Sequence, residues 1–466
     1  MRLQQNEEMN LTVARFEAGL QDGVSLDLSL AENERLVAYY TYLRSYSMVM
    51  EVLDMAIDHH PYAIHYKLKK ASTLLQLHQP KDALILIDEA AVLAPRDFDV
   101  LVLSIQVFIR LNQLDLAAQL LEELPEPFDA KQQADAYLVH ALWHETQLEF
   151  ERMYYFLRAA LDLCPEHLAV LEKIAIAVES TKRYEDSIRL HRAIIDRFPY
   201  NHQAWYNLGL ALVCNTDYLE ALEAFEYAFI IDPYFKDAYK EYIGWAFNTR
   251  QYHKVLHCYE DVGQNFDLSS DPTYLIKIGQ AYQAVEDFET AEYLYKEIIK
   301  WHGYEDEAYA QMAECRFIQC DYPGALHYYS KAIQLDDKRE DYYAARAEVY
   351  LRMDRLAQAE SDFISATRIA PQDGVYWVQY CSFLMQIGRA EEALYILEEE
   401  VSFEDPEMLY CRIACLFLLG KRKEARYRLL EAIGDHYDAH SILFDIIPDL
   451  ELDNDITAII AGHHYP

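Results

Sequence analysis

A repeat of 34 residues runs along almost the whole chain and constrains its fold more than any other feature. It is clearest in the unit that begins at His202. Positions 4, 7, 8, 11, 20, 24, 27 and 32 of that unit are Trp205, Leu208, Gly209, Leu212, Ala221, Phe225, Ala228 and Pro233. Apolar residues at helical spacing within so short a repeat predict two helices joined by a turn. Such a chain folds as an array in which each unit packs on its neighbours, without one central core.

Twelve units account for most of the 466 residues. They begin at Leu30, Ile64, Phe98, Ala134, Leu168, His202, Lys236, Pro272, Asp306, Glu340, Gly374 and Glu407. Position 8 is Ala or Gly in most units, and position 20 is most often Ala. Small residues recur where two helices approach most closely, since a larger side chain would overpack the contact. We therefore expect Ala325 and Ala359, both at position 20, to lie at tight contacts inside their units.

The order Trp, Leu-Gly, Ala, Phe, Pro at these offsets resembles the tetratricopeptide repeat (TPR) family. The resemblance extends over all twelve units, and it is to the long, acidic, uncharacterised repeat proteins of bacteria. It implies an all-α fold: a right-handed superhelical α-solenoid of about twelve helix–turn–helix units with terminal capping helices. We expect residues 1–29 to form an N-terminal capping segment, residues 30–439 the twelve-unit solenoid, and residues 440–466 the C-terminal capping helices, because the end units of an array need cover.

Charge and composition narrow the range of partners. The chain has 78 acidic and 41 Lys or Arg residues, for a formal net charge of −37. This charge disfavours nucleic acid and anionic lipid, which are bound through Lys and Arg. The carboxylates either keep an elongated body soluble or serve a basic client protein. We expect a cytoplasmic protein that does not insert in a membrane, because no apolar run has the length of a signal peptide or a membrane span, and we expect its eight scattered cysteines to be thiols.

Motifs of catalysis are missing from the sequence. None of the patterns G-x-x-x-x-G-K-[ST], G-x-G-x-x-G, H-E-x-x-H or G-x-S-x-G occurs, so we expect neither an enzyme nor a cofactor. Pairs spaced i, i+4 are the remaining metal candidates: His140/His144, His253/His257, His436/His440 and Cys411/Cys415. Two ligands fall short of the three or four of a zinc site, so no metal is expected either. The register of Ala414 predicts that Cys411 and Cys415 face the inner groove.

The family resemblance also indicates where a ligand would bind. In TPR proteins the first helices of the units line the concave face, and positions 2, 5, 6, 9, 12 and 13 point toward a bound ligand. In the sixth to ninth units the candidates at these positions are Tyr206, Asn207, Leu210, Val213, Lys240, Phe247, Asn248, Gln280, Gln283, Glu314 and Phe317. Aromatic anchors among amides are typical of a peptide groove. The alternative is a mixed, solvated helix face without a ligand.

These features together predict a non-enzymatic scaffold or adaptor that holds a peptide segment or a protein surface in its concave groove. The alternative is a peptide-responsive regulatory sensor that captures or releases a partner protein when a ligand binds. The partner, its pathway and the oligomeric state are left open by the sequence.

Overall fold

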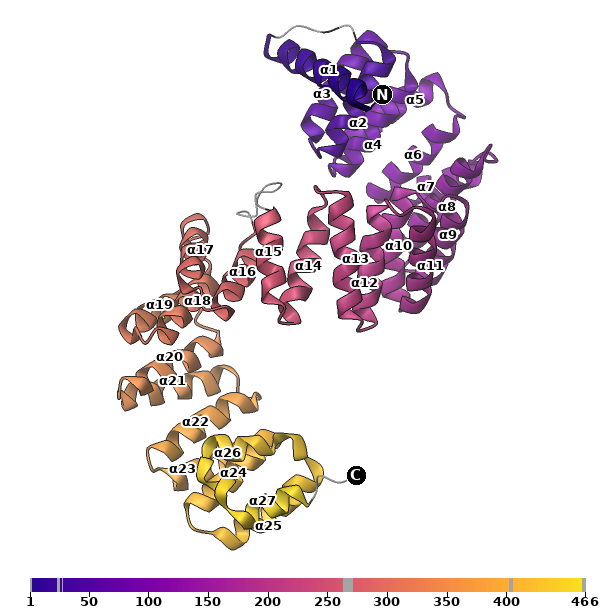
Figure 1. The fold of residues 1–466 in the computed structure, drawn as a ribbon. Helices are drawn as coiled ribbons and strands as arrows, with labels where there is room; N and C mark the ends of the chain where they lie inside the picture. The colour runs from indigo at the N-terminus through magenta and orange to yellow at the C-terminus, as the bar shows by residue number, and fades with distance from the viewer. Residues whose placement is uncertain (1, 23–25, 27, 263–270, 402–404, 463–466) are drawn as a thin grey trace. The chain divides into compact units, whose positions relative to one another are not determined.

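The computed structural model describes residues 2–22, 26, 28–262, 271–401 and 405–462. All of its regular structure is helical, and no strand occurs among these residues. The chain divides into two compact units, unit 1 (Met1–Phe266) and unit 2 (Asp267–Pro466), which we describe separately (Figure 1). The sequence analysis, which expects one continuous solenoid, does not anticipate this division.

Unit 1 is built from fifteen helices among its described residues. They are α1 (Arg2–Asp22), α2 (Leu30–Tyr42), α3 (Tyr46–His59), α4 (Ile64–Gln76), α5 (Pro80–Leu93), α6 (Phe98–Arg110), α7 (Leu114–Glu123), α8 (Ala130–Thr146), α9 (Phe150–Leu163), α10 (Leu168–Thr181), α11 (Tyr184–Arg197), α12 (His202–Cys214), α13 (Tyr218–Ile231), α14 (Lys236–Asn248) and α15 (Tyr252–Val262).

Unit 2 continues the same pattern of α-helices. They are α16 (Pro272–Ala284), α17 (Phe288–Trp301), α18 (Asp306–Ile318), α19 (Tyr322–Leu335), α20 (Glu340–Arg352), α21 (Leu356–Ile369), α22 (Gly374–Gln386), α23 (Ala390–Tyr395), α24 (Pro406–Leu418), α25 (Arg422–Asp435), α26 (Ser441–Ile446) and α27 (Asn454–Ala461). A π-helical turn, η2 (Ile396–Glu400), extends α23, and two 3₁₀ segments, η3 (Tyr437–His440) and η4 (Pro448–Leu452), flank α26.

From α2 to α25 the helices form twelve consecutive pairs, one for each predicted unit. Ten first helices begin at the predicted residue. The exceptions are α8, which begins at Ala130, four residues before Ala134, and α24, which begins at Pro406. The early start of α8 has a local cause, because the Asp129 side chain accepts a hydrogen bond of 2.8 Å from the backbone N–H of Gln132.

A left-handed residue separates the two helices of every pair. Ten of these residues are not glycine: Arg44, His78, Asn112, Leu148, Lys182, Thr216, Arg250, Glu286, Cys320 and Asp354. Gly388 and Gly420 hold the same place in the last two pairs. The αL conformation lets the chain reverse in three residues after the first helix ends. Its recurrence gives a second, purely geometric count of twelve units.

The two helices of a pair meet at the small residues of the repeat. A Cβ atom placed on Gly209 of α12 would lie 2.5 Å from the Phe225 ring of α13, and one on Gly279 of α16 would lie 2.5 Å from the Tyr295 ring of α17. Both rings are fully buried. Ala325 and Ala359 have no exposed surface, which confirms the expected tight contacts.

Apolar segments pack on both ends of the array. Phe16 of α1 is fully buried in a cluster with Leu36 and Val37 of α2, and Ser29 and Glu32 form the reciprocal bonds of a capping box. At the other end Leu443 and Ile456 are fully buried in the same cluster as Leu429 and Ile433 of α25. The domain boundaries at residues 29 and 439 stay predictions, and residues 1, 23–25, 27 and 463–466 of the expected caps lie outside the described residues.

Candidate functional site

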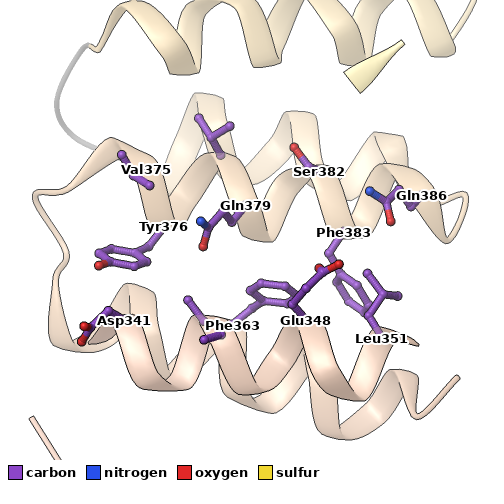
Figure 2. Close-up of a pocket in the computed structure, with 13 residues that line it drawn as sticks. Asp341, Glu348, Leu351, Phe363, Val375, Tyr376, Gln379, Ser382, Phe383 and Gln386 are labelled. Carbon is purple, nitrogen blue, oxygen red and sulfur yellow. The ribbon is translucent and has the colours of Figure 1, made fainter. Parts of the chain in front are cut away.

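A hollow in unit 2 lies between the first helices α20 and α22 (Figure 2). Its volume is about 520 Å³. It is lined by Asp341, Ala344, Ala345, Glu348, Leu351, Phe363, Val375, Tyr376, Val378, Gln379, Ser382, Phe383 and Gln386. Figure 2 shows Tyr376, Gln379 and Gln386 of α22 on one side and Asp341 and Glu348 of α20 on the other.

The floor of this hollow is apolar and its edge is polar. The buried rings of Phe363 and Phe383 lie 5.3 Å apart. At the edge, Arg339 donates two hydrogen bonds to the Asp341 carboxylate, at 2.8 and 3.0 Å. Arg352 pairs with Glu348 at 2.9 Å, so both acidic residues that line the hollow have a cationic neighbour.

A second hollow, of about 440 Å³, continues along the other side of α22. It shares Val378, Ser382 and Gln386 with the first. Its remaining lining residues come from α22, α24 and the C-terminal helix α26: Met385, Glu407, Leu418, Ile442, Asp445 and Ile446. The two hollows therefore form one groove, which we call the α22 groove, made by the last three repeats and α26.

Unit 1 has a hollow of about 360 Å³ on the equivalent helices α4, α6, α8 and α10. It is lined by Ser72, Leu75, Gln76, Gln106, Ile109, Arg110, Leu138, Leu142, Glu145, Thr146, Ala169, Glu172 and Lys173. Lys173 donates two hydrogen bonds of 2.9 Å to the Glu145 carboxylate. Burial raises the pKa of Glu172, although the nearby Arg44 and Lys173 oppose this.

The hollows lie at the positions that the family resemblance predicts, but in other units. All thirteen residues around the unit 1 hollow occupy positions 2, 5, 6, 9, 12 or 13 of the second to fifth repeats. Most residues of the α22 groove hold the same positions in the tenth and eleventh repeats. The eleven candidates were instead chosen in the sixth to ninth repeats, where the sequence pattern is clearest.

Asn207 does not face a groove, which corrects its assignment to the concave face. It is 2% exposed, and its amide N–H groups donate to the Leu171 carbonyl at 2.7 Å and to Nε2 of His191 at 3.2 Å. Its own oxygen accepts a hydrogen bond of 3.1 Å from Gln203. Position 6 of this repeat thus joins α12 to α10 and α11.

The three proposed aromatic anchors are half-buried and rest on neighbouring rings. The centroid of Tyr206 lies 4.9 Å from that of Phe235. Phe247 lies 5.7 Å from Tyr252, and Phe317 lies 5.9 Å from Tyr322. Each ring therefore has only part of its surface available to a ligand.

The other candidates also keep part of their surface accessible. Asn248 is exposed, and Leu210, Val213, Lys240, Gln280, Gln283 and Glu314 are half-buried. Gln283 accepts a hydrogen bond of 2.5 Å from the Tyr295 hydroxyl, and Glu314 accepts one of 2.7 Å from the Tyr329 hydroxyl. These two side chains thus accept the hydroxyl hydrogen bonds of buried tyrosines on the second helices, and the sequence pattern does not reveal this role.

Within unit 1 two turns far apart in the sequence are in contact. Arg44, between α2 and α3, lies 3.3 Å from the carboxylate of Asp232, between α13 and α14. The rings of Tyr42 and Tyr234 meet edge to face at 5.5 Å, and His202 lies 3.8 Å from the same carboxylate. Burial lowers the pKa of His202, although Asp232 opposes this. We call this contact of the first and sixth repeats the Arg44 clasp.

The register of Ala414 predicts that Cys411 and Cys415 face the inner groove, but they do not. Both are fully buried, and the Cys415 sulfur lies 3.4 Å from that of Met385. Hydrogen bonds to Cys381 and Cys415, together with burial, hold the pKa of the Cys411 thiol well above its usual range. Each of the eight cysteines has a free thiol.

The described residues offer neither a metal-binding cluster nor a membrane-spanning helix. No group of three or more His, Cys, Asp or Glu side chains is placed to hold a metal ion there. The His140 and His144 rings stack on Phe156 at 5.1 and 5.3 Å, and burial lowers the pKa of His140. No helix in the described part of the chain combines the length and the apolar character of a membrane span.

Comparison with known proteins identifies the repeat. Residues 173–234, which comprise most of α10 and all of α11, α12 and α13, match the model of the tetratricopeptide repeat family. This stretch therefore contains tetratricopeptide repeats, and the same period and helix pairing continue on both sides of it. No curated protein matches it.

Solved structures of similar chains share little sequence with this one. Yeast Tom70 is 16% identical with a TM-score of 0.39, over 91% of this chain and 94% of its own. Pseudomonas aeruginosa pilF is 14% identical with a TM-score of 0.37, over 55% of this chain and 99% of its own. YrrB, described as a TPR protein with an unusual peptide-binding site, is 14% identical with a TM-score of 0.33, over 40% and 95%.

Proposed function

We propose that this protein is a non-enzymatic interaction scaffold that holds a peptide segment or a protein surface in the grooves of its first helices. Repeat arrays of this kind present extended surfaces rather than closed pockets, and they bind partners along the inner helices. The observation that carries the proposal is the α22 groove, which runs from α20 across α22 to α24 and α26 in unit 2.

The groove offers both kinds of contact that a peptide needs. Val375 and Leu418 are 45% and 48% exposed, and an apolar anchor would cover surface that now meets water. Gln379 and Gln386 are exposed beside them, and each amide can donate to and accept from a peptide backbone. Apolar anchors between amides give affinity and register together.

The accessible candidates of the sixth to ninth repeats stay part of the proposed surface. They are Tyr206, Leu210, Val213, Lys240, Phe247, Asn248, Gln280, Gln283, Glu314 and Phe317. The sequence lacks the nucleotide, zinc and serine-hydrolase patterns considered above, and this favours binding over catalysis.

A peptide library tests the proposal with two matched variants. The full chain is screened against immobilised peptides, and each peptide that binds is measured again with Ser382→Trp and Ser361→Trp. Ser382 lines both hollows, so a Trp there fills the α22 groove, whereas Ser361 is exposed on the second helix α21. We expect Ser382→Trp to weaken binding about tenfold or more, as blocking a central contact does, and Ser361→Trp to leave it unchanged.

If Ser382→Trp still binds the peptides, the binding site does not lie in the α22 groove. The triple variant Tyr206→Ala, Phe247→Ala, Phe317→Ala then tests the surface of the sixth to ninth repeats. If neither variant weakens the binding of any peptide, the proposed binding in the α22 groove and on the sixth to ninth repeats is wrong.

A regulatory sensor is the second candidate, and the Arg44 clasp favours it. Glu172 lines the unit 1 hollow and also interacts electrostatically with Arg44, so a ligand in that hollow would act on the clasp. A ligand changes the shape of a protein only if it binds the two shapes with different affinity. Small-angle scattering with and without a bound library peptide separates the two candidates, because a rigid scaffold keeps its scattering curve.

A further inference from the structure

We propose that the partner segment held in the α22 groove is basic and amphipathic: a protein segment with apolar side chains on one face and Lys or Arg on its flanks. This inference rests on the proposed function and specifies the chemistry of its ligand. It follows from the charge of the groove, which differs from that of the other hollow.

The apolar part of the groove is at least partly exposed. Val375 and Val378 lie along α22, and the second hollow adds Leu418 of α24 with Ile442 and Ile446 of α26. Five aliphatic side chains from three helices thus follow one path. A partner helix would meet them with apolar residues spaced i, i+3, i+4 and i+7.

Every charged residue that lines the groove is acidic. Asp341, Glu348, Glu407 and Asp445 line the two hollows, and no Lys or Arg does. Arg339 and Arg352 compensate the first two. Neither Glu407 nor Asp445 has an ion-pair partner among the residues that the structure describes, so two carboxylates beside Leu418 and Ile442 keep their charge uncompensated.

Acidic residues also surround the other end of the groove. Burial, together with Glu340, Asp341 and Asp373, raises the pKa of Tyr376 to about 12 against the opposing effect of Arg339. Acidic side chains therefore border the apolar path at both ends, near Tyr376 and at Asp445. Clefts lined by one sign of charge concentrate ligands of the opposite sign.

The net charge of the chain does not by itself explain this arrangement. The unit 1 hollow is also built from first helices of the repeats, yet it contains Arg110 and Lys173 beside Glu145 and Glu172. The charges there are balanced, and one pair is hydrogen-bonded. The α22 groove thus has four acidic lining residues and no basic one, whereas the hollow on α4, α6, α8 and α10 has two of each sign. The acidic lining disfavours an acidic peptide, because an acidic segment would leave Glu407 and Asp445 facing like charges.

Three dye-labelled synthetic peptides test the inference on the full chain. They are a helical peptide with Leu at i, i+3, i+4 and i+7 and Lys at the flanks, the same peptide with Glu at the flanks, and a Lys peptide of the same composition with the Leu positions scrambled. Fluorescence anisotropy measures each affinity at two salt concentrations. We expect the patterned Lys peptide to bind at least about tenfold more tightly than the other two, with an affinity that falls as salt rises.

Charge variants locate the binding. The double variant Glu407→Lys, Asp445→Lys should lower the affinity for the patterned Lys peptide by about tenfold or more and raise the affinity for the Glu peptide. The control Glu223→Lys, Asp88→Lys makes the same change of net charge at exposed residues of the second helices α13 and α5 of unit 1 and should have little effect. Glu407 lies in the first turn of α24, so Glu407→Gln, Asp445→Asn provides a milder second variant, and circular dichroism confirms that each is folded.

The possible outcomes separate this inference from the proposed function. Equal weakening by the control variant would mean attraction to net charge alone, and the inference would be wrong. It would also be wrong if the scrambled peptide bound equally well, or if reversing Glu407 and Asp445 changed nothing. If Ser382→Trp weakens the binding of library peptides but these peptides are neutral or acidic, the proposed scaffold function is supported and the proposal of a basic partner is wrong. If no peptide depends on Ser382, both fail for this groove.

Discussion

Replacing Gly209 by Ala tests the close approach on which the repeat is built. The new Cβ would lie 2.5 Å from Cε1 of Phe225 and 2.7 Å from Cδ1. Ordinary van der Waals contact begins near 3.4 Å, so the ring and the methyl group must separate by about 0.9 Å. Phe225 has no exposed surface, and its ring has little room to move.

The expected effect is the difference of two terms. Overpacking a core contact costs about 1–3 kcal/mol, and a separation this large places Gly209→Ala near the upper end. Ala is about 1 kcal/mol better than Gly inside a helix, which offsets part of that cost. We therefore expect the free energy of unfolding to fall by about 2 kcal/mol.

Gly434→Ala is the matched control. Gly434 lies in α25, and a Cβ there meets no atom within 4 Å, so the propensity term acts alone. Urea titration should show Gly434→Ala stabilised by about 0.5–1 kcal/mol and Gly209→Ala destabilised. Adding Phe225→Leu to Gly209→Ala should make the double variant less destabilised than the sum of the two single changes. If Gly209→Ala and Gly434→Ala changed the free energy of unfolding in the same direction, the packing argument would be wrong.

Three further predictions address the rest of the molecule. Deleting His440–Pro466 should cause concentration-dependent association in size-exclusion chromatography, because it removes the buried Leu443 and Ile456 from the end of the array; a truncated chain that stays monomeric would show that this segment is a tail. Arg44→Glu should open the Arg44 clasp and speed hydrogen exchange at residues 42–46 and 232–236, whereas Lys69→Glu on α4 should not; unchanged exchange in Arg44→Glu would mean that the clasp does not hold these turns. Burial lowers the pKa of His191 to about 4, so the unfolded chain binds the extra proton as pH falls below about 6.5, and stability should drop by about 2 kcal/mol between pH 7 and pH 5. The variant His191→Gln should lose less over that range, and an identical pH profile would contradict a buried neutral imidazole.

Much of the fold follows from local sequence signals. The starts of ten first helices and the burial of Ala325 and Ala359 agree with the 34-residue pattern, because small residues, caps and turns act within one pair of helices. The inner positions 2, 5, 6, 9, 12 and 13 do line the hollows of the second to fifth, tenth and eleventh repeats. These are properties that one repeat has regardless of its place in the array.

The individual site residues were harder to assign, since each depends on the neighbouring repeat. Asn207 has a groove position in the sequence, but the Leu171 carbonyl and His191 of the preceding repeat take its hydrogen bonds. Cys411 and Cys415 were assigned to the groove from the register of one helix, yet Met385 and Cys381 of the preceding repeat enclose them. A helical wheel does not show what the next helix covers.

The sequence by itself determined the repeat, the count of twelve units and the helix positions, because a 34-residue period fixes contacts between residues close in the chain. Tertiary structure alone decided which repeats have a hollow on their inner face and which charges surround it. It also brought Arg44 to Asp232 across 188 residues. Such contacts sum small rotations over several repeats, and no local pattern encodes that sum.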